Sequence, residues 1–321
     1  MARRAGTVRG RWLLWTGIIA AQAACDSAKV ADRNGERSVV QPIGRFVAAD
    51  EVAISQPARI AASPDGSVFV SEPTAGVVLH VTDGKIDFGI VDLDQPLGVA
   101  IRGDLLLVGN AGRGSVDVYS VSERKYLRSL GSGAGEFAMP NDLAAAPDGE
   151  IYVADSKANV VRMYRLDGTS DGSFGALGDG LGAFRFPVAV AVDGERVVVG
   201  DQGNHRVQVF DRHGAFVSSF GEPLPMSADT GGTAPDLAGR FTRIQGVVLD
   251  GERIDVLDSF HSTVQAFDLA GRALGFSGRR GACEGCFGLG LGLTLAAPGR
   301  VIVTDPDHHR LVSFNAAGGL R

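Results

Sequence analysis

Short apolar runs separated by turn-forming residues recur along most of this chain. The run Ile151-Tyr152-Val153-Ala154 follows a turn at Asp148-Gly149, and the run Val197-Val198-Val199 follows one at Asp193-Gly194. Runs of this length, rich in β-branched residues, are typical of strands, and Asp-Gly pairs suit tight hairpins because both residues tolerate positive φ. The pattern predicts many short antiparallel strands rather than helical domains. Glycine, at 45 of 321 residues, is about twice as frequent as the usual ~7%.

One unit of this pattern occurs six times. Each copy ends its apolar run with a polar residue, which we call the anchor, and a hydrophobic residue follows nine positions later. The anchors are Glu72, Asn110, Asp155, Asp201, Asp258 and Asp305, and the hydrophobic positions are Val81, Tyr119, Tyr164, Phe210, Phe267 and Phe314. Successive anchors lie 38 to 57 residues apart, which is the spacing of four-stranded β-propeller blades. The chain is therefore expected to be all-β, with a six-bladed propeller over residues 38–321.

Residues 200–210, Gly-Asp-Gln-Gly-Asn-His-Arg-Val-Gln-Val-Phe, resemble the NHL repeat. The segments that end at Phe137, Phe184 and Phe241 are similar to the glycine-phenylalanine lead-in of that repeat. Copies three, four and six match well, whereas copies one, two and five are degenerate. The resemblance implies a six-bladed β-propeller of four-stranded antiparallel blades.

Closure of the ring can be predicted from the two ends of the repeats. Seven residues follow Phe314, which leaves the last blade without a fourth, outer strand. Residues 38–47 precede the first copy and have no other assignment. We expect them to pair beside the Phe314 strand, so that the N-terminal strand closes the last blade and no sheet edge stays open.

Residues 1–24 resemble a bacterial lipoprotein signal. A basic start precedes the apolar stretch 12–21, which is too short to span a bilayer because that takes ~20 residues. In such signals the cysteine, here Cys25, becomes the lipidated first residue. Gln22 departs from the motif, and ordinary cleavage after Ala23 is the competing interpretation. Both predict export to the cell envelope, with residues 25–37 as a linker and membrane contact only through the lipid.

The composition of the exported part narrows the partners. The signal holds four arginines and no acidic residue, so its removal leaves 27 basic against 37 acidic residues, a net charge near −10. Such a surface repels phosphate backbones, which argues against nucleic acid. Both tryptophans, Trp12 and Trp15, lie in the signal, which disfavours sugar binding by tryptophan stacking. We expect a monomer with a protein or small-molecule ligand.

In NHL-like enzymes, the residues just after the blade-opening proline line the mouth of the central channel. These positions hold Ala58-Arg59, Leu97-Gly98, Asn141-Asp142, Val188-Ala189, Gln245-Gly246 and Gly292-Leu293. Peptide-amidating lyases and streptogramin lyases carry histidine there, and this set has none. Its absence argues against both lyase chemistries.

Pro140-Asn141-Asp142-Leu143 resembles the Pro-Asn-Gly-Leu of gluconolactonase-like propellers, in which the asparagine binds a divalent cation. The other ligands of that pattern are missing, and Ca²⁺ takes six to eight oxygens. We therefore expect no cofactor and no catalytic residue. Arg59, Asn141, Asp142 and Gln245 are candidates for a polar ligand site, and the alternative is that they solvate an empty channel mouth. A divalent-metal-dependent lactonase, esterase or lyase is the competing function.

The repeated polar residues have a structural interpretation. A carboxylate at a strand end can accept hydrogen bonds from turn amides and pair with an arginine such as Arg206 or Arg310. Four histidines follow the anchors in equivalent loops of different blades, where ligands would not converge on one metal. These are His205, His261, His308 and His309.

Two features lie outside the repeat. Cys283 and Cys286 are the cysteines left after Cys25, and in an exported chain an even remainder predicts a disulfide, here one that staples the loop leading to the sixth blade. Haem attachment would need histidine in place of Phe287, and thioredoxin-like chemistry would need a helix that is not predicted. Residues 222–240 form an insertion rich in small polar residues, which serves either recognition or spacing. The expected role is a binding or interaction module.

Overall fold

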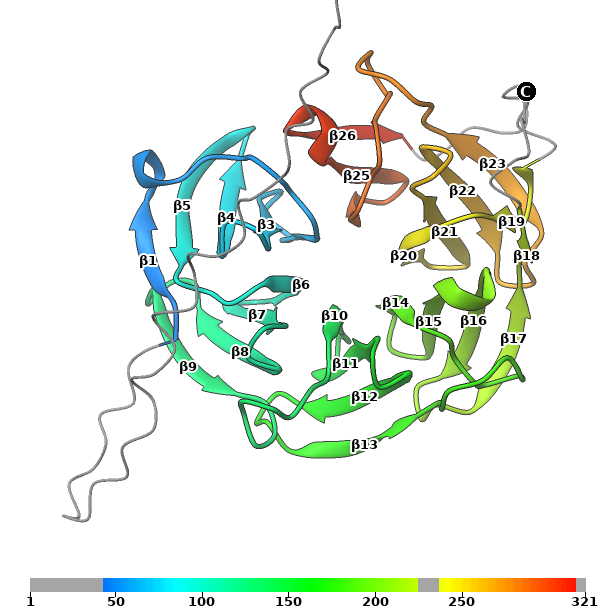
Figure 1. Ribbon diagram of the computed structural model, residues 1–321, viewed down its shortest axis with the longest axis horizontal. Coiled ribbons are helices and arrows are strands. Elements are labelled where there is room, and N and C mark those ends of the chain that lie inside the picture. Colours follow the sequence, from blue (N-terminus) through cyan, green and yellow to red (C-terminus); the bar gives the residue numbers. More distant parts are fainter. Residues whose placement is uncertain (1–42, 225–236, 316–321) are drawn as a thin grey trace, which may run out of the picture. The chain divides into compact units, whose positions relative to one another are not determined.

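The computed structural model describes residues 43–224 and 237–315, which form six antiparallel sheets arranged around a common centre (Figure 1). The prediction of an all-β, six-bladed propeller is confirmed. Helical turns in the described ranges are short 3₁₀ segments such as η1 (Ala49–Glu51), η2 (Gln202–Asn204) and η4 (Pro306–His308).

Each blade runs from an inner strand outward in chain order. Blade 1 contains β2 (Ile60–Ala62), β3 (Val68–Glu72), β4 (Val77–Thr82) and β5 (Lys85–Val91). Blade 2 contains β6 (Pro96–Arg102), β7 (Leu105–Asn110), β8 (Ser115–Ser120) and β9 (Lys125–Ser129). Blade 3 contains β10 (Pro140–Ala145), β11 (Glu150–Asp155), β12 (Val160–Arg165) and β13 (Ser170–Phe174).

The second half of the ring repeats this order. Blade 4 contains β14 (Pro187–Val192), β15 (Arg196–Asp201), β16 (Arg206–Asp211) and β17 (Phe216–Phe220). Blade 5 contains β20 (Ile244–Asp250), β21 (Arg253–Asp258), β22 (Thr263–Asp268) and β23 (Ala273–Ser277). Blade 6 contains β24 (Leu293–Ala297), β25 (Arg300–Asp305) and β26 (Arg310–Asn315).

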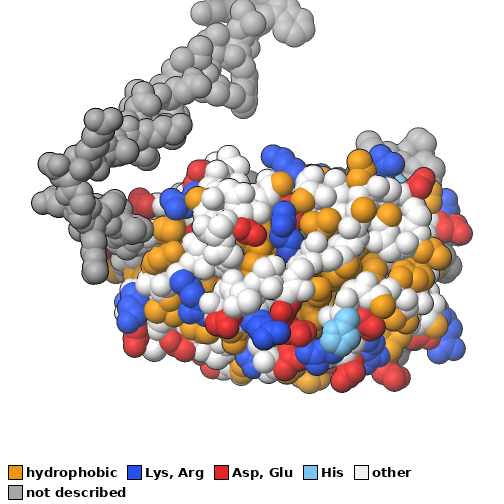
Figure 2. Space-filling view, turned by 90° about the horizontal axis from the view of Figure 1, so that it is seen from below, with side chains coloured by type: hydrophobic (Ala, Val, Ile, Leu, Met, Phe, Trp, Pro, Cys, Tyr) orange, Lys and Arg blue, Asp and Glu red, His pale blue; other side chains and the backbone are white. Residues whose placement is uncertain are grey.

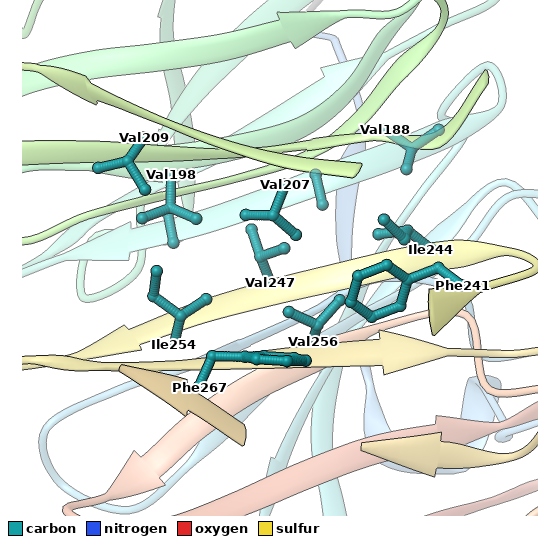
Figure 3. Close-up of a cluster of buried hydrophobic side chains, with 12 residues drawn as sticks. Val188, Val198, Val207, Val209, Phe241, Ile244, Val247, Ile254, Val256 and Phe267 are labelled. Atoms are coloured by element: carbon teal, nitrogen blue, oxygen red, sulfur yellow. The ribbon is translucent and has the colours of Figure 1, made fainter. Parts of the chain in front are cut away.

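The core lies between neighbouring blades. Figure 3 shows one such layer, in which Val198 and Val207 of blade 4 face Val247 and Ile254 of blade 5. Because the middle strands are covered on both faces, they are apolar along their length instead of alternating, and this is why the sequence shows continuous apolar runs.

The predicted closure by the N-terminal strand is wrong. The strand β1 (Arg45–Ala48) pairs antiparallel with β5 as a fifth strand on the outside of blade 1, and not beside β26. Its Phe46 ring lies 5.6 Å from the ring of Phe88 and 6.2 Å from that of Tyr119. This aromatic contact with blades 1 and 2 explains which sheet edge the segment joins.

In the described residues, blades 1 and 6 meet through side-by-side contacts. Thr304 Oγ1 donates a hydrogen bond to the carbonyl of Ala58 over 2.8 Å, and the amide of Ala62 donates to Thr294 Oγ1 over 3.1 Å. The backbones approach closely at Gly292, where an added Cβ would lie 2.4 Å from the Ala58 carbonyl oxygen. The seam therefore combines polar contacts from blade 1 to both β24 and β25 with apolar packing of Ile302 and Leu311 on the core of blade 1.

Several predictions fall outside the described residues. These are the export signal 1–24, Cys25 with its lipid, the linker 25–37 and the middle of the insertion, residues 225–236. Within the described ranges, no helix combines the length and apolar character that a membrane crossing requires.

Candidate functional site: the channel mouth

The six anchors are the last residues of the second strands, and each is fully buried. Their side chains accept hydrogen bonds from the backbone that leads to the first strand of the same blade. Asp201 Oδ1 accepts from the amide of Arg185 over 2.7 Å, and Asp155 Oδ1 accepts from that of Met139 over 2.8 Å. The anchors therefore position the chain at the mouth of the channel without facing it.

Three of the anchors form ion pairs with arginines of the same blade. Arg206 Nε donates to Asp201 Oδ2 over 2.9 Å, and Arg310 Nε donates to Asp305 Oδ2 over 3.1 Å. Arg162 pairs with Asp155 in the same way at 2.9 Å. Burial raises the pKa of Asp201, and the hydrogen bonds from Arg185, Asn204 and Arg206 oppose that rise. These buried ion pairs hold loops within a blade.

Three of the four histidines near the anchors have hydrogen-bond partners, whereas the buried Nδ1 of His205 has none among the described residues. His308 Nδ1 lies 2.8 Å from Asp305 Oδ2, and His261 Nε2 lies 2.9 Å from Thr242 Oγ1. His309 Nδ1 lies against the carbonyl oxygen of Ser55. Within residues 43–224 and 237–315, no three His, Cys, Asp or Glu side chains are grouped so that they could hold a metal ion.

A cavity of about 270 Å³ runs along the centre of the ring and is lined by the inner strands of all six blades. Its walls are mostly Ala, Val, Leu and Ile, because the inner strands are short and apolar. Asp142, at the mouth end of β10, is the ionisable side chain among the described lining residues. The ionisable group of the channel lining therefore lies at this end.

Arg59 fills the mouth. It immediately precedes β2 in blade 1, and its side chain crosses the centre to the opposite blades. Nη2 donates to Asn141 Oδ1 over 2.6 Å and to the carbonyl of Val188 over 2.9 Å. Nη1 donates to the carbonyl of Leu291 over 2.8 Å and to that of Gln245. One guanidinium thus joins blade 1 to blades 3, 4, 5 and 6.

Asp142 supplies the opposite charge beside this guanidinium. Its Oδ2 accepts from the amide of Val190 over 3.0 Å. Burial raises the pKa of Asp142 to about 6, and the charge of Arg59 opposes that rise. Burial also lowers the pKa of Arg59, with Asp142 acting against it. The two opposite charges therefore partly offset the cost of each other's burial.

The structure brings together the four residues predicted for the mouth, although not as an open site. Arg59, Asn141 and Asp142 contribute side chains, whereas Gln245 contributes its backbone carbonyl. The carbonyls of Val188 and Leu291, which also accept hydrogen bonds from Arg59, were not predicted. A backbone carbonyl cannot be recognised from the type of its residue. The one indication in the sequence was Arg59 itself, a long cationic side chain among the shorter side chains at the other mouth positions.

Comparisons with known proteins agree with this architecture. Residues 137–162 and 184–210 match the family model described as NHL repeat. The chain is a β-propeller with NHL repeats. A stretch of 93 residues, 28% of this chain, is 27% identical to the protein brain tumor of Drosophila melanogaster, and the match spans 9% of that protein's length.

Solved structures share the fold of this NHL propeller. The hydrazine synthase of Kuenenia stuttgartiensis has a TM-score of 0.58 at 16% identity, covering 83% of this chain and 97% of that one. Virginiamycin B lyase from Staphylococcus aureus has a TM-score of 0.57 at 11% identity, with coverages of 85% and 88%. A chain of a nidogen/laminin complex has a TM-score of 0.53 at 15% identity, with coverages of 68% and 79%. At these identities the likeness extends to the fold alone.

Blade 4 of the NHL propeller exposes large apolar side chains at its rim. Leu177 and Leu181, in the loop before β14, are 67% and 69% exposed, and Val217 on β17 is 59% exposed. Phe216, next to Val217 in the chain, is also exposed. A Cβ added at Gly182 would lie 3.9 Å from the Cβ of Phe216. We call these four residues the blade 4 apolar group. Figure 2 shows the edge of the ring, where hydrophobic side chains lie between charges of both signs.

Cys283 and Cys286 form a disulfide in the loop before blade 6, the pairing that the sequence suggested. Cys283 is exposed and Cys286 is fully buried. Arg279 Nε donates to Cys286 Sγ over 3.2 Å. The two sulfurs therefore differ in access and in electrostatic surroundings.

Proposed function

We propose that this NHL propeller is an exported, lipid-anchored interaction module that binds a protein partner at the blade 4 apolar group. The observation that carries the proposal is the filled channel mouth. Arg59 occupies the place where propeller enzymes would need open ligands, and both of its terminal nitrogens are bonded to protein groups.

The mouth is poorly suited to bind a catalytic cation. Asn141 Oδ1, the oxygen that the lactonase resemblance would assign to a metal, accepts from Arg59 over 2.6 Å. A cation placed there would also meet the positive charge of the guanidinium. Like charges at such short range disfavour binding strongly in a buried site.

The rim offers a better surface for recognition. The buried centre of a protein–protein interface is more apolar than the rest of the surface and is depleted in charged residues. The blade 4 apolar group offers apolar side chains on the blade that precedes the insertion 222–240. A propeller of this fold in a nidogen/laminin complex supports a protein partner by analogy of architecture.

The N-terminal sequence supports placement in the cell envelope. A lipid on Cys25 would tether the propeller to a membrane, and the predicted linker 25–37 would separate the two. Cys25→Ser should release the protein into the soluble fraction of lysed cells. A variant that stays with the membrane would contradict anchoring at this residue.

Site-specific photocrosslinking in cells tests the proposal. A photoreactive amino acid at Leu181 should give a discrete crosslinked product, whereas the same label at the exposed Lys125 of blade 2 should not. Val217→Ser should abolish that product without changing the melting temperature. Equal crosslinking at both positions would refute recognition at blade 4. Stoichiometric Ca²⁺ binding that is lost in Asp142→Asn would instead support a metal-dependent enzyme.

A further inference from the structure

We infer that the Cys283–Cys286 disulfide is redox-active and exchanges with a dithiol reductant, with Cys283 as the attacked sulfur and Cys286 as the departing thiolate. This assignment differs from a purely structural staple. The same loop occurs in two blades, the two cysteines are unequally exposed, and Arg279 lies beside one of the sulfurs.

The loop before blade 6 has a counterpart of the same geometry before blade 4. The amide of Phe287 donates to the Arg279 carbonyl over 3.1 Å, as the amide of Phe184 donates to the Ala176 carbonyl over 2.8 Å. Phe287 and Phe184 are both fully buried. The two loops therefore have one backbone design.

An arginine at the equivalent position of each of these two blades holds the loop before that blade. Arg310 donates to the carbonyls of Ala282 and Cys286, each over 2.9 Å. Arg206 donates to the corresponding carbonyls of Asp179 and Ala183, each over 2.8 Å. In blade 4 the positions of the two cysteines are taken by Gly180 and Ala183. The loop before blade 4 thus has this backbone conformation without a disulfide. In the loop before blade 6, the disulfide is therefore not needed to form that conformation.

The two sulfurs are unequally accessible. Cys283 is exposed, whereas Cys286 is fully buried. Thiol–disulfide exchange requires a thiolate to reach one sulfur in line with the other. An incoming thiolate can therefore attack Cys283 but not Cys286.

Arg279 is placed to stabilise the departing group. Its Nε donates to Cys286 Sγ over 3.2 Å, and a guanidinium beside sulfur favours the thiolate over the thiol. A better-stabilised thiolate leaves faster. Attack at Cys283 would thus expel the sulfur that already has a cationic partner.

The exchange balances as a two-electron transfer. One thiolate of the reductant bonds to Cys283 Sγ, the bond between the two cysteines breaks, and its electron pair remains on Cys286. The second thiolate of the reductant then attacks the reductant's other sulfur, which is bonded to Cys283 in the mixed disulfide. A disulfide forms within the reductant, and Cys283 leaves as a thiolate. The reductant ends as a disulfide and the loop as a dithiol.

Reduction of the folded protein provides the first test. Dithiothreitol under native conditions should reduce the bond fully and lower the melting temperature by only a few degrees, because the hydrogen bonds from Arg310 remain. A bond that is reduced only after addition of denaturant, or a propeller that unfolds on reduction, would show a structural staple and overturn the proposal.

Two pairs of variants test the roles of the residues. Arg279→Gln should slow reduction by dithiothreitol about five-fold, as a poorer leaving group does, and Arg280→Gln, which removes the same charge one residue away, should not. Cys286→Ser should form a mixed disulfide with glutathione at Cys283, whereas Cys283→Ser should form none. Equal rates for the two arginine variants, or equal adducts for the two cysteine variants, would overturn the assignment.

Discussion

Arg59 reaches across the centre of the propeller to Asn141, with Nη2 2.6 Å from Asn141 Oδ1, although 82 residues separate them in the chain. The same guanidinium also bonds to carbonyls of blades 4, 5 and 6. The described residues show no strand shared between blades 1 and 6. Arg59 therefore acts as a central tie in a ring whose first and last blades meet through side-by-side contacts in the described residues.

Arg59→Met should lower the free energy of unfolding by about 3 kcal/mol, because it leaves several buried carbonyls without a donor. Urea denaturation followed by circular dichroism measures the change. Arg45→Met is the matched control, since Arg45 is exposed at the rim of blade 1, and it should have no measurable effect. Equal midpoints for the two variants would show that the tie does not stabilise the ring.

Asp142→Asn should change how stability depends on pH. The pKa of Asp142 is about 6 in the folded chain and ~3.9 in an unfolded one, so the folded state binds the proton more tightly. The stability that this proton provides is complete below pH ~4 and is lost as the pH rises through about 6, by about 3 kcal/mol in all.

The asparagine variant cannot titrate, so its stability relative to the parent should rise from about pH 4 through pH 6 and level off about one pH unit above the folded pKa. Urea midpoints of both proteins across this range provide the measurement. A constant difference would mean that Asp142 has an ordinary pKa in the folded state.

Gly292→Ala should weaken the seam between blades 1 and 6. The added Cβ would lie 2.4 Å from the Ala58 carbonyl oxygen, which belongs to the backbone and cannot swing away. We expect a loss of about 3 kcal/mol, measured by thermal and urea unfolding. Gly180→Ala is the control, because nothing lies within 4 Å of its Cβ. Similar losses in both would argue against a tight seam.

Arg206→Met should destabilise blade 4 by about 3 kcal/mol, because it leaves the buried Asp201 carboxylate without its cation. Arg165 forms an equally short pair with Asp171, 2.8 Å apart, but its side chain is 64% exposed. Arg165→Met should therefore change the urea midpoint little. The order of the two effects tests whether burial decides the value of these pairs.

Replacement of residues 225–236 by a short glycine-serine linker should leave the propeller folded. The ends of the insertion are held together by the parallel pairing of β18 (Glu222–Pro223) with β19 (Arg240–Phe241). We expect an unchanged melting temperature and weaker crosslinking from Leu181, because the insertion follows the same blade. Full crosslinking in the shortened protein would exclude the insertion from the contact.

The sequence predicted the repeated parts of this protein because each of them is local. The anchor, the hydrophobic position nine residues later and the turn between strands all lie within one blade, so six copies predict six blades. The pairs Asp201–Arg206 and Asp305–Arg310 were predictable for the same reason, since each spans five residues.

Tertiary structure alone decided the features that join distant blades. The segment of β1 was expected beside blade 6, but Phe46 packs on Phe88 and Tyr119, and the burial of these rings selects the edge of blade 1. The four mouth residues were predicted from their positions after the blade-opening prolines. The closing of the mouth by Arg59, however, depends on backbone carbonyl oxygens, which every residue has. By itself the sequence determined the six blades and their anchors. The filling of the channel mouth followed only when the ring brought those carbonyls within reach of Arg59.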